Sequence, residues 1–87
     1  MIPRPTLVLI GGGTVVERSR VLAIIDAAAK SLPLMKYREY MGQNGRLVDI
    51  TKGRAVRCFI LTDSNHLFLS SVHAETIKSR LEDDDEL

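Results

Sequence analysis

Residues 45–81 read GRLVDITKGRAVRCFILTDSNHLFLSSVHAETIKSRL, and this stretch decides the fold. It contains two apolar segments rich in β-branched and aromatic residues, Ala55–Thr62 and His66–Ser71. The turn-forming residues Asp63–Asn65 separate them, which predicts a β-hairpin. A shorter strand is predicted at Leu47–Ile50, ahead of the polar loop Thr51–Arg54.

Two helices are predicted around these strands. The first runs from about Ser31 to Gln43, because Pro33 suits a first helical turn and Asn44-Gly45 supplies a left-handed stop. The second begins after the hairpin, where Ser71 precedes Glu75 and the apolar residues that follow recur four apart on one helical face.

The sequence upstream of the first helix predicts three more strands. They are Thr6–Ile10, Thr14–Glu17 and Val21–Ile25. The run Gly11–Gly13 predicts a tight turn between the first two strands, and Arg18–Arg20 is a polar connector. The predicted order is β-β-β-α-β-β-β-α, an α+β fold with mainly antiparallel pairing.

Length and charge indicate one small domain that works as an assembly. The chain of 87 residues allows one domain, residues 1–81, and a single small core whose marginal stability favours homo-oligomers. Its net charge of +1 averages two regions. Residues 1–80 carry all twelve lysines and arginines against six acids, a net +6, whereas five of the last six residues, 82–87, form an acidic tail.

The motifs argue against an enzyme, a cofactor and a metal. The glycine-rich turn lacks the phosphate-loop lysine, and Val16 stands where a dinucleotide-binding glycine would be. His66 and Asp63 have opposite strand parity, which opposes an acid–base pair, and no zinc-ligand spacing is present. The one cysteine, Cys58, lies in an apolar run and is expected to be buried. No segment is long enough to span a membrane or has the form of a secretory signal, so we expect a cytoplasmic protein.

Six cations are the candidate binding residues. Arg18 and Arg20 share the connector, and the others surround one strand–loop–strand unit: Arg46, Lys52, Arg54 and Arg57. Arginine in a glycine-containing loop suits phosphate, because its planar guanidinium donates two parallel hydrogen bonds and the backbone can approach closely. The alternative is that these are solvated surface charges of a small domain.

The sequence resembles the RemA-type family of bacterial biofilm-matrix regulators from Thr6 to Leu81. The matching features are Leu47-Val48-Asp49, Gly53-Arg54, Asp63-Ser64-Asn65-His66, Leu69-Ser70, Glu75-Thr76, Arg20 and Pro33. The resemblance implies a DNA-binding transcriptional regulator of matrix-production and osmoprotection genes, built as a ring-like homo-oligomer. It implies DNA contacts by Arg20 and Arg54, with Arg57 a weaker candidate.

One position departs from the family pattern. The family commonly has a second arginine after the first, where this chain has Ala55. The resemblance therefore implies weaker DNA binding unless Lys52 or Arg46 compensates. The expected partners are double-stranded DNA and further copies of the chain, with no membrane and no small-molecule substrate evident. The alternative is a structural oligomer or protein-interaction module whose arginines pair with acids of neighbouring subunits.

Overall fold

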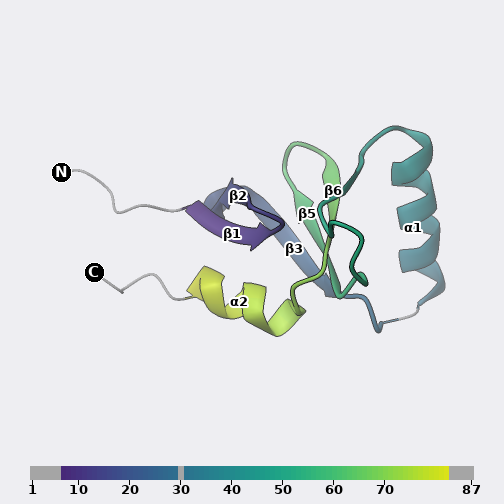
Figure 1. The fold of residues 1–87 in the computed structure, drawn as a ribbon. Coiled ribbons are helices and arrows are strands. Elements are labelled where there is room, and N and C mark those ends of the chain that lie inside the picture. Colours follow the sequence, from purple (N-terminus) through teal and green to yellow (C-terminus); the bar gives the residue numbers. More distant parts are fainter. Residues whose placement is uncertain (1–6, 30, 83–87) are drawn as a thin grey trace.

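The computed structural model describes residues 7–29 and 31–82, and within them it confirms the α+β class and the predicted order of strands and helices (Figure 1). A short 3-10 helix, η1, occupies the polar connector. The elements are β1 (Leu7–Gly11), β2 (Thr14–Glu17), η1 (Arg18–Arg20), β3 (Val21–Asp26), α1 (Leu32–Gln43), β4 (Leu47–Asp49), β5 (Cys58–Thr62), β6 (His66–Ser70) and α2 (Ala74–Glu82). Most of the acidic tail, residues 83–87, lies outside the described part.

The strands form two sheets. β1 and β2 pair as an antiparallel hairpin, which confirms the turn predicted at the glycines. The other sheet has the order β3-β5-β6-β4, and β5 and β6 form the predicted hairpin, with Thr62 opposite His66. One pair departs from the expected antiparallel pattern, because β4 runs parallel to β6 with Val48 opposite Phe68.

The strand predicted from Ala55 begins three residues later, at Cys58. The sheet order explains this difference. β4 and β5 are not neighbours but lie on either side of β6, so residues 50–57 must cross the end of β6 before β5 can start. Arg57 marks the end of the crossing, since its N–H donates to the carbonyl of Ser70 at 2.7 Å.

The predicted single core is divided into two clusters by the four-stranded sheet. β5 shows the division, because successive side chains of a strand point to opposite faces. Cys58 and Ile60 belong to a cluster with residues of β1 and α2, whereas Phe59 belongs to one with Met41 of α1. The β1–β2 hairpin and α2 therefore cover one face and α1 covers the other (Figure 1).

The helix starts follow from local hydrogen bonds. α1 begins where predicted, with the Ser31 hydroxyl accepting from the N–H of Leu34 at 3.3 Å. α2 begins at Ala74, between Ser71 and Glu75, in agreement with the start that the sequence signalled. Residues after β6 must first turn away from the sheet, and the first carbonyl of the helical turn is that of His73, which accepts from the N–H groups of Thr76 and Ile77.

The tip of the β1–β2 hairpin contacts the loop that follows β4. Gly12 has φ +56°, and a Cβ at this position would overlap the carbonyl oxygen of Ile50. Beneath it, the buried Ser70 hydroxyl donates to the carbonyl of Ile10 at 2.5 Å. The hairpin thus supports residues 50–57 from one side.

Candidate nucleic-acid interface

The sheet register places the candidate cations at two ends of the four-stranded sheet. One end, which we call the turn end, holds the β5–β6 turn Asp63–Asn65 together with η1, since Val21 pairs with Thr62. The other, the loop end, holds residues 50–57, since Cys58 pairs with Ser70. The five residues of β5 separate the ends by about 15 Å at ~3.3 Å a residue.

At the turn end, Arg20 is engaged within its own chain. Its Nη1 donates to Oδ2 of Asp63 at 3.3 Å, and its carbonyl accepts from the N–H of Asp63 at 2.9 Å. The two side chains are 65% and 39% exposed, so this is a surface ion pair of small energetic weight. Glu17, just before η1, accepts from the N–H and hydroxyl of Ser19, and these bonds lower its pKa. Arg18 is half-buried, and its Nε has no hydrogen-bond partner in the described part of the chain.

Arg46 lies apart from the other cations of its predicted group. It precedes β4, and its carbonyl accepts from the N–H of Leu67 at 2.9 Å, which puts it toward the turn end. β4 and β3 are the two edges of the sheet, so Arg46 and Arg20 are separated by three strand spacings, about 14 Å. The structure therefore brings together only part of the predicted cation set.

At the loop end, Lys52, Arg54 and Arg57 are exposed. Within residues 7–29 and 31–82, none of these three side chains makes a hydrogen bond or an ion pair. Lys52 has φ +57° and Gly53 has φ +83°, so the backbone is left-handed at two successive residues. For lysine this conformation costs about 1–2 kcal/mol, which surrounding bonds must offset.

The loop is anchored at Thr51. This buried threonine donates from both its N–H, at 2.9 Å, and its hydroxyl, at 2.7 Å, to Oδ1 of Asp49. These two bonds lower the pKa of the Asp49 carboxyl. The carbonyl of Thr51 in turn accepts from the N–H of Arg54 at 3.1 Å. These bonds fix the backbone that carries the cations, whose side chains have no partner among the described residues.

His73, which the sequence did not connect with these cations, joins this surface. A cleft of about 400 Å³ is lined by Asp26, Arg57, His73 and small apolar residues. One oxygen of the Asp26 carboxylate already has a hydrogen bond, because its Oδ1 accepts from the N–H of Ala28 at 2.8 Å. The spacing of Arg57 and His73 in the sequence does not predict that they lie together. The sheet and the start of α2 bring them into one cleft.

The described residues contain no group of three or more histidine, cysteine, aspartate or glutamate side chains that could hold a metal ion. Cys58 is fully buried, and burial raises the pKa of its thiol, so the thiolate is disfavoured. Neither helix in the described ranges has the length and apolar character needed to cross a bilayer.

Comparison with known proteins gives a family match across this whole fold. Residues 7–81 match the RemA-like family, described as "Extracellular matrix regulatory protein A-like". Three similar proteins are each named "Putative regulatory protein". The one from Nitratidesulfovibrio vulgaris is 46% identical over 91% of this chain and 88% of its own length. That from Maridesulfovibrio salexigens is 48% identical over 88% and 87%, and that from Kosmotoga olearia 42% identical over 85% and 73%.

Proposed function

Because this chain belongs to the RemA-like family, a family of regulatory proteins, we propose that it controls transcription by binding duplex DNA as a ring-like homo-oligomer. The proposal includes control of biofilm-matrix genes and action in the cytoplasm. The observation that carries it is the loop end, where three exposed cations have no partner within the described chain. Phosphate oxygens of a nucleic acid are the partners that such groups lack.

The loop end suits contact with the DNA backbone more than reading of base edges. Arg54 and Arg57 offer planar guanidinium groups that can each donate two parallel hydrogen bonds to one phosphate. Lys52 adds a point charge beside Gly53, where the absence of a side chain allows close approach. Such contacts fix position on the duplex, and selectivity then comes largely from DNA shape.

Repetition of the loop end around a ring would raise the affinity for DNA above that of a single copy. One protomer offers two or three phosphate contacts, whereas a ring presents the same loop several times to one duplex. The logarithm of affinity should then fall with the logarithm of salt concentration with a slope of about −0.9 for each phosphate neutralised. The alanine at position 55, where the family has arginine, would weaken the contact of each copy with DNA. Lys52 and Arg57 lie in the same loop and can compensate for the missing charge, whereas Arg46 lies outside this loop.

The test is Arg54→Ala. We expect retention of any duplex in a gel shift to weaken at least about tenfold at low salt, with a shallower salt slope, because every copy then neutralises one phosphate fewer. Lys78→Ala is the control, since it removes an exposed cation from α2, outside residues 50–57. Equal decreases for the two variants, or unchanged retention by Arg54→Ala, would contradict a binding role for the loop end.

The second candidate is a protein-interaction module. It is favoured by large apolar side chains that stand exposed on β1, β2 and α1. A titration with salt, followed by DNA retention and by oligomer size, separates the two functions. Contacts with phosphate weaken as the salt concentration rises, whereas apolar contacts persist. We expect DNA retention to disappear at a salt concentration that leaves the size of the oligomer unchanged. A protein whose oligomer size is independent of salt but which retains no duplex even at low salt would favour the interaction module.

A further inference from the structure

An apolar surface lies on the outer side of the β1–β2 hairpin. Val8 and Ile10 of β1 point into the core, so by strand alternation Leu7 and Leu9 point away from it. Leu7, Leu9 and Val15 are 66%, 44% and 51% exposed. We call these three side chains the hairpin face. At its rim, Nη1 of Arg80 donates to the carbonyl of Leu9 at 2.8 Å, which leaves further guanidinium donors available.

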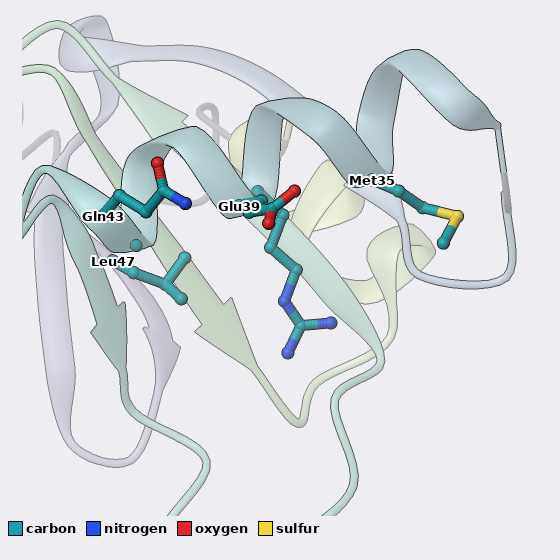
Figure 2. Close-up of a pocket in the computed structure, with 6 residues that line it drawn as sticks. Met35, Glu39, Gln43 and Leu47 are labelled. Carbon is teal, nitrogen blue, oxygen red and sulfur yellow. The ribbon is translucent and has the colours of Figure 1, made fainter.

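A second apolar surface lies along α1. Met41 is the one fully buried residue of this twelve-residue helix, and Leu32 and Met35 are 62% and 59% exposed. Beside them runs a cleft of about 470 Å³, in which Met35, Glu39 and Gln43 lie along one side of the helix and Leu47 of β4 completes the lining (Figure 2). We call this cleft, together with the exposed Leu32 of the same helix, the helix groove.

The groove continues on the other flank of Met35. A second cleft, of about 330 Å³, shares Met35 and Arg38 with the first and reaches Leu34 and Phe59. The Arg38 guanidinium lies 5.4 Å from the centre of the Phe59 ring. Such a long arginine stem covers apolar surface while its charged head stays hydrated, so the groove floor is apolar over both clefts.

We propose that the hairpin face of one copy of this chain seats in the helix groove of the next copy. This interface rests on the proposed homo-oligomer and specifies how its copies meet. The two faces lie at opposite ends of the molecule, with β1 and β2 at one end and α1 at the other (Figure 1). One chain cannot cover either face with the other. Two unlike faces joined head to tail form a heterologous contact, which closes into a ring when the rotation between copies permits.

Charge at the two rims agrees with this pairing. Arg80 stands beside the hairpin face, and Glu39 lines the helix groove with no side-chain hydrogen bond or ion pair in the described part of its own chain. Docking the apolar residues would bring a cation and an acid of different copies to the same rim. Self-pairing of either face would instead leave the other face exposed and would oppose like charges at the rim.

Two lysine substitutions test the pairing by complementation. Leu9→Lys places a charge on the hairpin face and Met35→Lys places one in the helix groove. Each variant alone should sediment with the mass of a single chain, because every interface it could form has one damaged face. An equimolar mixture should sediment with the mass of two chains, because the intact groove of Leu9→Lys accepts the intact hairpin of Met35→Lys and the remaining faces are both damaged.

The controls distinguish a damaged interface from a general effect of added charge or of misfolding. Thr76→Lys adds the same charge on an exposed part of α2 and should leave the oligomer unchanged. If a lysine variant misfolds by circular dichroism, Val15→Lys and Leu32→Lys repeat the test on the same two faces. An oligomer that survives either substitution, or two variants that remain single chains when mixed, would overturn the inference.

The outcome for DNA binding is separate. Arg54→Ala should form oligomers of normal size while failing to retain DNA, so an intact wild-type oligomer that ignores DNA overturns the proposed function and leaves the interface standing. If the protein binds DNA and no lysine substitution on the hairpin face or in the helix groove dissociates the oligomer, the proposed interface is wrong but the proposed function stands. A wild-type protein that sediments as one chain overturns the interface together with the proposed ring.

Discussion

The two ends of the four-stranded sheet carry the same kind of side chain in opposite circumstances. At the turn end, Arg20 is held by Asp63 of its own chain. At the loop end, Lys52, Arg54 and Arg57 have no such partner within the described ranges, and the backbone beneath them is left-handed at Lys52 and Gly53. A cation that is already paired contributes to the fold, whereas an unpaired one on a fixed backbone is available to a ligand.

The same distinction ranks the residues that the family resemblance implied. Arg54 lies at the loop end and needs no rearrangement to meet a phosphate. Arg20 would first have to leave Asp63, so a contact with DNA would carry an additional cost. If the proposed function holds, substitutions at the loop end should change the affinity for DNA, whereas substitutions at the turn end should change a small part of the stability.

The largest expected effect comes from breaking the support of the loop end at Gly12→Ala. A Cβ at this left-handed position would overlap the Ile50 carbonyl oxygen, so we expect the free energy of unfolding to fall by about 3 kcal/mol or more. Gly13→Ala is the control, because its φ of +80° is also left-handed but nothing lies within 4 Å of the new carbon, and it should cost only about 1–2 kcal/mol. Urea denaturation measures both. Equal decreases would mean that the hairpin does not support the loop.

The contact between the β1–β2 hairpin and the loop after β4 is of a kind that the sequence could not predict, because it joins segments far apart in the chain. The pattern of β-branched residues and turns predicted nearly every strand, because local burial repeats every second residue. It placed the start of β5 three residues early, because nothing in residues 55–57 reveals that the chain is still crossing β6. The parallel pairing of β4 with β6 was missed for the same reason, since strand order depends on distant contacts.

The candidate site shows the same limit. The sequence identified the residue types and the loop Lys52–Arg54, since glycine and arginine in a polar segment are a local signal. It grouped Arg46 with that loop by proximity in the chain, whereas β4 carries Arg46 toward the opposite end of the sheet. It did not connect His73 with the cations, whereas the fold places this residue and Arg57 in the lining of one cleft.

A smaller change in stability is expected at Lys52, where two substitutions separate the effect of the charge from that of the left-handed backbone. Lys52→Gly should raise the free energy of unfolding by up to about 1 kcal/mol, because glycine adopts the left-handed conformation without steric cost. Lys52→Ala keeps the strain. Both variants should reduce the salt slope of DNA binding by about 1 for each phosphate that is no longer neutralised, because both remove the cation. A DNA affinity that follows stability rather than charge would count against a direct contact by Lys52.

At the turn end the expected effect is smaller still. A double-mutant cycle of Arg20→Ala and Asp63→Ala should give a coupling of about 0.5 kcal/mol, because both partners are exposed to solvent, and added salt should reduce it. Asp63→Asn frees Arg20, so duplex affinity measured by gel shift should rise about twofold if Arg20 also reaches DNA. A fall in affinity would mean that the ion pair holds Arg20 in its binding position.

The smallest effect is a response to acid, and it compares one carboxylate at each end. Hydrogen bonds from Thr51 lower the pKa of Asp49 at the loop end, and those from Ser19 lower the pKa of Glu17 at the turn end. A carboxyl whose pKa is lower in the folded state contributes stability above its ordinary value, about 3.9 for Asp and 4.3 for Glu, and that stability is lost as pH falls through the folded value. Thr51→Val should therefore flatten the acid limb of the unfolding free energy, followed in urea between about pH 5 and 2, and so should Ser19→Ala.

Only Thr51→Val should also weaken DNA retention at neutral pH, because Asp49 and Thr51 hold the backbone beneath Lys52 and Arg54. Ser19→Ala changes a neighbour of a cation that is already paired, and retention should stay unchanged. If both variants flatten the acid limb and neither alters DNA binding, the bonds to Asp49 stabilise the loop without positioning its cations. The difference between the two ends would then lie in the free side chains alone and not in the backbone that carries them.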